Sequence, residues 1–235
     1  MRVLVTRPKD DTAALKQELQ KRGVTVTLDP MLEIRRNAEA SIELDGVQGL
    51  LFTSSNGIRA FATLSDERDL PTYCVGDETA RTCRSANFTD VHSAAGNVEA
   101  LAAYVIAQAR PGDGRMVHIA GSVGAGDLAG ALRDAGFSVD RIALYDAIPA
   151  TALAEETKNA FKQGHLDGVL FFSPRTAATF VSLVKAAELE SACRRVDAYC
   201  LSTGVAQPVG ELPWRRIVTA AEPTRAALLT TLGQG

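Results

Sequence analysis

The sequence predicts an α/β fold built from parallel sheets in two similar lobes. Short apolar runs alternate with amphipathic helical segments along all 235 residues, which is the pattern of strand–helix–strand units. The chain also repeats itself, because residues 50–61 (LLFTSSNGIRAF) resemble residues 169–180 (VLFFSPRTAATF) at an offset of 119. One pattern used twice most simply builds two lobes, and a cleft between lobes is a common place for a small-molecule site.

Two further repeats show how the lobes are connected. Residues 73–76 (YCVG) match residues 199–202 (YCLS) at an offset of 126, and residues 15–26 resemble residues 128–139 at an offset of 113. The copy of the opening segment comes late, so the two sets are circularly shifted against each other. The simplest path starts lobe one, builds all of lobe two and then returns.

The expected boundaries follow from this path. They are residues 1–33 plus 149–235 for lobe one, residues 37–143 for lobe two, and linkers near residues 31–37 and 143–150.

The expected strands are short and the helices between them are amphipathic. The strands are residues 3–6, 25–29, 49–53, 72–76, 90–94, 116–120, 139–145, 168–172, 198–202 and 216–220. The helices are residues 12–22, 58–64, 98–109, 127–135, 176–185 and 224–232. Residues 12–22 are typical, since Leu15 and Leu19 form an apolar stripe and Gly23 follows as a C-cap.

Composition excludes several function classes. The net charge is −3 and the sequence pI is about 5.7, so we expect no nucleic-acid partner. No apolar run is long enough to cross a bilayer, so we expect no membrane partner. Met1 leads directly into an apolar run, which predicts a cytoplasmic protein without a signal peptide.

The cysteines and histidines do not form a metal-binding pattern. Cys74 and Cys200 occupy equivalent strand positions, and we expect both to be buried small side chains, as suits a reducing compartment. The three histidines fall in different segments without a Cys or acidic neighbour, so we expect no metal.

Polar and small residues follow nearly every expected strand. In open parallel sheets ligands bind at the carboxyl ends of the strands, where helix N–H groups can also bind anions. The candidate binding residues are Arg7, Thr53, Ser54, Ser55, Asn56, Gly76, Thr79, Gly96, Asn97, Ala120, Gly121, Ser122, Ser173, Arg175, Thr176, Ser202 and Thr203. Each loop taken alone also fits simple helix capping, whereas many such loops in one cleft indicate a ligand with many anionic groups.

Catalytic candidates are few. The glycine-rich segment at residues 121–126 matches neither a P-loop nor a dinucleotide loop, and no nucleophilic triad or carboxylate pair is visible. Tyr145 stands out because it lies at an expected lobe crossing, where a phenol could donate a proton. The alternative is an aromatic side chain that packs across the hinge.

Together these fragments resemble the uroporphyrinogen-III synthase family across the whole chain. The matching segments are residues 3–8, 51–57, 74–80, 96–101, 171–177 and 222–224, and Tyr145 with the Pro149 that follows it. Their order and spacing are more specific than any single segment.

The resemblance implies two flavodoxin-like, HemD-like α/β lobes with parallel sheets, joined by a two-stranded linker. It also implies cyclisation of hydroxymethylbilane, a substrate with eight carboxylates, to uroporphyrinogen III with inversion of ring D, and no cofactor. Tyr145 matches the family tyrosine proposed to assist departure of the substrate hydroxyl. Some relatives have a threonine pair where this chain has Gly204 and Val205, so Ser202 or Thr203 would serve instead.

Partners and alternatives complete the expectations. We expect a monomer, with hydroxymethylbilane synthase as a transient partner. Two other functions stay open: a non-catalytic two-lobed protein that binds a polyanion, and a flavodoxin-type electron carrier. The carrier would need aromatic residues around a flavin, and the aromatic content is only 6%.

Overall fold

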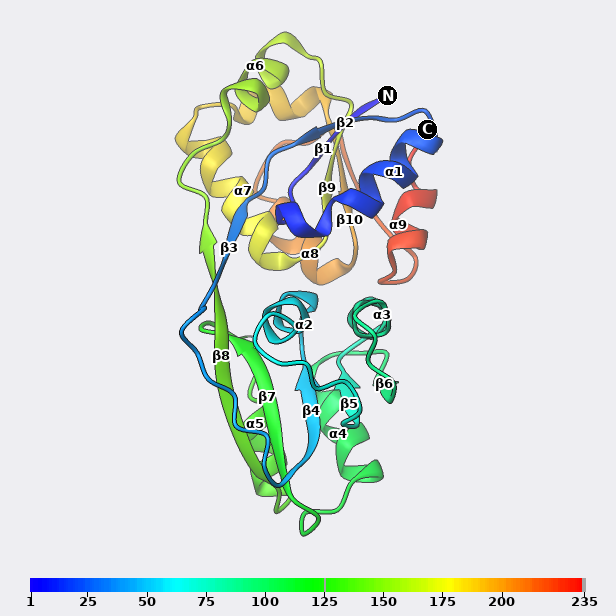
Figure 1. The fold of residues 1–235 in the computed structure, drawn as a ribbon. Coiled ribbons are helices and arrows are strands. Elements are labelled where there is room, and N and C mark those ends of the chain that lie inside the picture. The colour runs from blue at the N-terminus through cyan, green and yellow to red at the C-terminus, as the bar shows by residue number, and fades with distance from the viewer. Residues whose placement is uncertain (125, 234–235) are drawn as a thin grey trace. The chain divides into compact units, whose positions relative to one another are not determined.

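The computed structural model describes residues 1–124 and 126–233 and divides into two compact units (Figure 1). Unit 1 comprises Met1–Glu33 and Ile148–Gly235, and unit 2 comprises Ile34–Ala147. The chain passes from one unit to the other within two strands, β3 (Leu32–Arg36) and β8 (Ser138–Pro149). These two strands are neighbours in one sheet.

Unit 1 is a parallel sheet of five strands with helices on both faces. The strand order is β11 (Arg216–Thr219), β10 (Asp197–Cys200), β9 (Gly168–Phe171), β1 (Arg2–Val5) and β2 (Thr25–Leu28). One face packs on α6 (Glu155–Gln163), α7 (Pro174–Ala186) and α8 (Thr203–Val209), and the other on α1 (Ala13–Lys21) and α9 (Arg225–Thr230). Two short 3-10 helices, η1 (Lys9–Asp11) and η2 (Glu190–Arg195), complete the unit.

Unit 2 has the same layered plan on a sheet of six strands. The order is β3, β8, β7 (Arg115–Gly121), β4 (Val47–Phe52), β5 (Thr72–Cys74) and β6 (Val91–Ser93). Helices α2 (Ser55–Phe61) and α3 (Asp77–Ser85) cover one face, and α4 (Val98–Gln108) and α5 (Leu128–Asp134) the other. The pairs from β4 to β8 are parallel, which confirms the predicted fold class.

Strand register repeats between the units with the offsets found in the sequence. Val169 of β9 lies between Leu4 and Ala198, and Leu50 of β4 lies between Val117 and Thr72. The outer pairs agree too: Val3 with Val26 corresponds to Met116 with Val139, and Tyr199 with Val218 corresponds to Tyr73 with His92. The sequence repeat is therefore a structural repeat, strand for strand.

A glycine in each central strand shows the repeat in side-chain packing. A Cβ atom at Gly49 would lie 3.0 Å from Cε2 of Tyr73, and one at Gly168 would lie 2.6 Å from Cε2 of Tyr199. The absent side chain thus makes room for an aromatic ring on the adjacent strand. Cys74 and Cys200 end these adjacent strands, and both are buried as expected.

Some helices differ from expectation. The helix expected at residues 58–64 begins earlier, at Ser55, because the Ser54 side chain accepts a hydrogen bond from the Asn56 N–H and caps it there. Helices α3, α6 and α8 were not expected. They have only seven to nine residues and bury few large apolar side chains, so little apolar sequence marks them.

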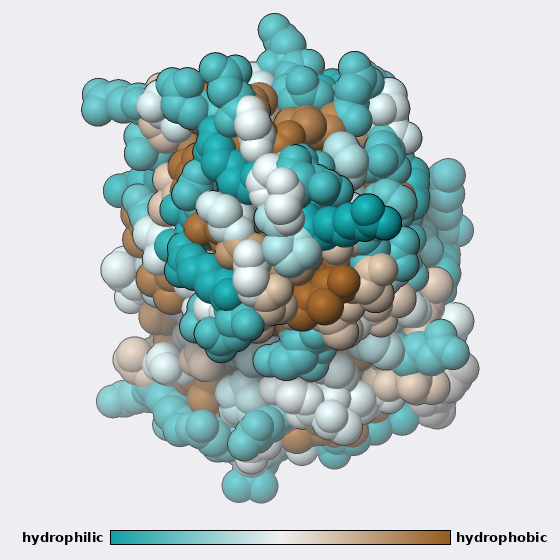
Figure 2. Space-filling view, turned by 90° about the horizontal axis from the view of Figure 1, so that it is seen from below, coloured by the Kyte–Doolittle hydropathy of each residue, from teal (hydrophilic) through white to brown (hydrophobic). Residues whose placement is uncertain are grey.

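The visible surface is mostly polar. Figure 2 shows a face on which hydrophilic residues predominate and hydrophobic residues form small separate groups. Within the described residues, no helix combines the length and the hydropathy needed to span a membrane.

Candidate functional site

A pocket of about 210 Å³ opens at the carboxyl ends of the central strands of unit 2. We call it the carboxyl-edge pocket. Its lining residues are Thr53, Ser54, Val75, Val98, His118, Ala120, Gly121, Val123, Gly124, Gly126, Arg141 and Tyr145. Of the predicted site residues, Thr53, Ser54, Ala120, Gly121 and Tyr145 come together here.

Tyr145 is held against the strand that ends in Gly121. The pairing of β7 with β8 shifts register just before Gly121, so that Tyr145 becomes its partner. A Cβ atom at Gly121 would lie 2.9 Å from the Tyr145 ring, so only glycine lets the ring lie this close. The Ser122 N–H donates to the Tyr145 carbonyl at 2.9 Å. Tyr145 is 9% exposed, and among the described residues its hydroxyl has no hydrogen-bond partner.

His118 is the buried titratable group of the pocket. Only 7% of the residue is exposed, and its Nε2 lies 3.4 Å from Oγ1 of Thr53. Its Nδ1 atom is buried, without a hydrogen-bond partner in the described part of the chain. Burial, with a smaller contribution from the Arg141 charge, lowers the pKa of His118 to about 4. The imidazole is therefore neutral near pH 7.

Arg141 brings positive charge to the pocket. It is the register partner of His118 on the neighbouring strand. Its Nη2 donates to the carbonyl oxygen of Gly121 at 2.5 Å and more weakly to that of Ser122 at 3.4 Å. These bonds hold the guanidinium beside the loop, and no carboxylate among the described residues pairs with it.

The neighbouring predicted residues of α2 serve local structure. Ser54 caps the helix by accepting from the Asn56 N–H at 3.1 Å. The Ser55 hydroxyl is buried and lies 2.8 Å from that of Thr82, which ties α2 to α3. Asn56 accepts from Arg59 at 3.1 Å. Ser55 and Asn56 do not line the pocket.

The predicted residues at the starts of α3 and α4 also lie outside the pocket lining. Gly76 precedes α3 and Thr79 is buried within it. The Gly96 N–H donates to the Val75 carbonyl at 3.0 Å, and Asn97 caps α4 by accepting from the Ala100 N–H at 2.9 Å. Their role in binding stays a prediction.

The predicted residues of unit 1 gather at the carboxyl edge of its own sheet, after β1, β9 and β10. The Ser173 and Thr176 hydroxyls lie 2.7 Å apart, and Ser173 also caps α7. The Arg7 guanidinium lies 4.7 Å from the centre of the Phe172 ring and 3.6 Å from an oxygen of Asp11. Arg175 lies in the first turn of α7. Ser202 is the N-cap residue of α8 and Thr203 its first residue.

Sequence reasoning missed two polar residues of the carboxyl-edge pocket, His118 and Arg141. In the sequence His118 is one of three histidines that fall in different segments, and no motif singles it out. A signal was available, because the repeat places Val5 and Leu28 of the opening segment at the equivalent positions. Val5 is buried and apolar, whereas His118 at the equivalent position of unit 2 is buried and ionisable, which indicates a local change of role.

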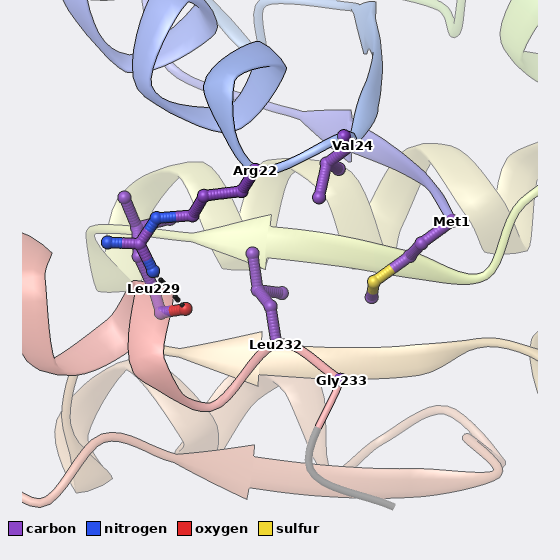
Figure 3. Close-up of a pocket in the computed structure, with 7 residues that line it drawn as sticks. Met1, Arg22, Val24, Leu229, Leu232 and Gly233 are labelled. Atoms are coloured by element: carbon purple, nitrogen blue, oxygen red, sulfur yellow. Dashed lines mark hydrogen bonds between the residues drawn. The ribbon is translucent and has the colours of Figure 1, made fainter.

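A second pocket, of about 280 Å³, lies in unit 1 beside the amino end of β1 (Figure 3). Met1, Val24 and Leu232 border it, and Arg22 lies across it with Nη1 donating to the Leu229 carbonyl at 2.9 Å. It contains no predicted site residue. Among the described residues, no group of three or more His, Cys, Asp or Glu side chains is placed to hold a metal ion.

Comparisons with known proteins agree on one family. The family model described as uroporphyrinogen-III synthase HemD matches residues 13–230. A uroporphyrinogen-III synthase from Chlorobaculum parvum is 24% identical over 227 residues, covering 88% of this chain and 89% of that protein. A porphyrin biosynthesis protein HemD from Ruminiclostridium josui is 24% identical over 92% of this chain, which spans 45% of that longer protein.

Solved structures show the same fold. The uroporphyrinogen-III synthetase of Helicobacter pylori superposes with a TM-score of 0.65 at 15% identity, covering 98% of both chains. A mutant uroporphyrinogen III synthase of Thermus thermophilus superposes with a TM-score of 0.56 at 16% identity, covering 98% of this chain and 96% of that one.

Proposed function

This chain belongs to the uroporphyrinogen-III synthase family, and from that premise we propose that it cyclises hydroxymethylbilane to uroporphyrinogen III with inversion of ring D. It is an enzyme of tetrapyrrole synthesis and a lyase. The family match over residues 13–230 carries the proposal, and the carboxyl-edge pocket adds a place where a phenol, a hydroxyl and a guanidinium meet.

The reaction needs shape and charge more than a nucleophile. Loss of the terminal hydroxyl of hydroxymethylbilane as water gives an azafulvene, which closes at the substituted carbon of ring D to a spiro intermediate. Fragmentation and reclosure then give the type III isomer. Closure without an enzyme gives type I, so the protein's main task is to hold one geometry of the substrate.

We assign the departure of the hydroxyl to Tyr145. Its ring lines the pocket against Gly121, and its hydroxyl has no hydrogen-bond partner among the described residues. A phenol placed in this way can donate a proton as the C–O bond breaks. Because the leaving group also departs slowly without help, the acid raises the rate without being indispensable.

The product isomer tests the activity. The purified chain is supplied with freshly made hydroxymethylbilane, and the products are oxidised and separated as type I and type III porphyrins. We expect type III to exceed type I from the first time points. Type I alone, formed at the rate without protein, would exclude the enzymatic function and leave a binding protein.

Tyr145→Phe tests the acid. We expect its kcat to fall by about 10- to 100-fold, with type III still the main product. Tyr104→Phe is the matched control, since Tyr104 lies on α4 of the same unit with its hydroxyl 3.4 Å from His92, outside the pocket lining. Equal turnover in the two variants would limit Tyr145 to packing.

The same proposal covers the setting of the enzyme. We propose a cytoplasmic monomer that meets hydroxymethylbilane synthase only transiently. Light scattering after size exclusion measures the mass of the chain alone and mixed with that enzyme. We expect the mass of one chain in the first case and no stable complex in the second.

A further inference from the structure

The two units differ at three neighbouring positions near the carboxyl ends of their equivalent strands. The positions hold, in unit 2 and unit 1 respectively, His118 and Val5, Thr53 and Phe172, and Arg141 and Leu28. The equivalence rests on strand register, because His118 pairs with Arg141 as Val5 pairs with Leu28. Unit 1 thus shows that apolar side chains at these places are compatible with the fold.

The polar residues of unit 2 are therefore not required by the sheet itself. Burying an imidazole in place of a valine costs free energy unless its polar atoms are paired. His118 is more than nine-tenths buried, and its Nδ1 has no partner in the described part of the chain. A buried ionisable residue at one copy of a repeated position, where it lines a pocket, indicates a role other than packing.

The unpaired Nδ1 atom also identifies the hydrogen on the other nitrogen. A buried N–H without an acceptor costs more than a buried lone pair without a donor. We therefore assign the hydrogen to Nε2, which donates to Oγ1 of Thr53 across 3.4 Å. The Thr53 hydroxyl then has its own hydrogen free to donate to another acceptor.

Arg141 supplies a positive charge, which Thr53 and the neutral His118 lack. Its Nη2 is held by the carbonyl oxygens of Gly121 and Ser122, and its charge meets no carboxylate among the described residues. A guanidinium has further N–H groups and pairs well with a carboxylate. The pocket thus joins a fixed positive charge to a directed hydroxyl donor.

We propose that Arg141, Thr53 and His118 form a subsite that binds one carboxylate of the substrate within unit 2. Arg141 provides the charge and Thr53 donates a hydrogen bond, while His118 acts as a positioning residue that directs the Thr53 hydroxyl. This subsite rests on the proposed function, because hydroxymethylbilane supplies the carboxylate. It also gives unit 2 a specific side-chain contact that unit 1 lacks at the equivalent positions.

The charge is tested first, by steady-state kinetics with hydroxymethylbilane. We expect Arg141→Gln to raise KM by about tenfold with kcat and the type III fraction nearly retained. Arg110→Gln is the matched control, since Arg110 is exposed, precedes β7 at the other end of the strand and lies outside the pocket lining. Equal KM values for the two variants would overturn the subsite.

The positioning role of His118 is tested by a double variant with Thr53 and by a glutamine that can replace its hydrogen bond. Thr53→Val and His118→Val should each raise KM by about threefold, and the double variant by no more than either alone, because both remove the same hydrogen bond. His118→Gln, whose amide N–H can replace the Nε2–H, should restore KM. Independent, multiplying effects, or no rescue by glutamine, would refute the positioning role.

The failures of the two proposals are distinguishable. If the wild-type chain forms no type III isomer, the proposed function fails. If it forms type III while Arg141→Gln behaves as Arg110→Gln, only the subsite fails. Near-UV circular dichroism of each variant confirms that the compared proteins are folded.

Discussion

The two units share one strand register, yet they complete the carboxyl edges of their sheets in opposite ways. In unit 1 the polar groups there satisfy one another, with Ser173 paired to Thr176 and the Arg7 guanidinium placed over the Phe172 ring. In unit 2 His118 and Tyr145 line a pocket, and the buried His118 Nδ1 atom and the Tyr145 hydroxyl have no hydrogen-bond partners among the described residues. In a repeated fold, the site is best sought where the two copies stop agreeing.

At the amino ends of the strands it is unit 1, and not unit 2, that holds a buried ionisable group. In unit 1 the Asp197 carboxylate is fully buried and accepts from Tyr199, Arg215 and Arg216. The repeat places Pro71, which has no ionisable group, at the equivalent position of unit 2. The buried charge of unit 1 is fully paired and stabilises the fold, whereas the polar groups of the carboxyl-edge pocket in unit 2 are left available for binding.

The largest effect expected is the loss of the Asp197 cluster. Asp197→Ala leaves the buried Tyr199 hydroxyl without its acceptor and frees two arginines, so we expect unit 1 to lose about 3–4 kcal/mol of stability. Urea unfolding followed by the fluorescence of Trp214, the single tryptophan, reports on unit 1. Asp167→Ala, at an exposed carboxylate, is the control.

A pH titration should separate the two units. His118 is neutral when folded, with a pKa of about 4 against 6.5 when free, so the unfolded chain takes up a proton first as the pH falls. Unit 2 should therefore lose about 3 kcal/mol between pH 6.5 and 4, and His118→Val should remove that loss. Hydrogen exchange of β7 in the wild type and in His118→Val measures the stability of unit 2 at each pH. The same dependence of stability on pH in the two proteins would contradict a neutral, buried His118.

The Asp197 carboxylate responds in a lower window. Its burial raises its pKa, but hydrogen bonds from Arg215, Arg216 and Tyr199 and the charge of Arg215 outweigh that effect and hold the pKa at about 2, against 3.8 when free. Its contribution is complete above pH 3.8 and is lost as the pH falls towards 2. The Trp214 signal of unit 1 should therefore be nearly independent of Asp197 between pH 6.5 and 4.

The paired glycines offer a sharper comparison of packing. In Gly168→Ala the new Cβ would lie 2.6 Å from the Tyr199 ring, which is fully buried and held by its bond to Asp197. In Gly49→Ala the nearest atom is 3.0 Å away, on the less buried Tyr73 ring. We expect losses of about 2 kcal/mol and about 1 kcal/mol respectively by thermal unfolding. A larger loss of stability in Gly49→Ala than in Gly168→Ala would show that the packing around Tyr199 adjusts more easily than the packing around Tyr73.

The smallest expected effects concern the helix caps. Ser54→Ala and Ser173→Ala each remove a side-chain acceptor from a helix start, and each should cost about 1 kcal/mol. Ser202→Ala should cost less than about 0.5 kcal/mol, because the Ser202 side chain makes no capping hydrogen bond to α8. Denaturant midpoints rank the three, and an equal loss at Ser202 would contradict the capping geometry.

Much of the fold could be predicted from local patterns. The buried strand residues 50–52 and 169–171 form continuous apolar runs, and their repetition at a constant offset reappears as identical register. Helix α3 escaped prediction because its buried residues, Thr79, Ala80 and Cys83, are too small or too polar to form an apolar stripe. Periodicity is informative only where large apolar side chains carry it.

The candidate site was also predicted from the sequence only in part. The order of polar residues after strand ends pointed to Thr53, Gly121 and Tyr145, because parallel strands bring their carboxyl ends to one edge. The same rule also selected Ser55 and Asn97, whose hydrogen bonds serve neighbouring helices. A loop sequence alone does not separate a capping residue from a ligand-binding one.

By itself the sequence determined that the chain forms parallel α/β sheets from a repeated pattern, since apolar spacing acts on neighbours within a few residues. Only the tertiary structure decided which polar groups stay unpaired. His118 meets Thr53 across 65 positions, and Arg141 meets Gly121 across 20. Such encounters depend on distances between strands, and those distances exist only once the sheet has formed.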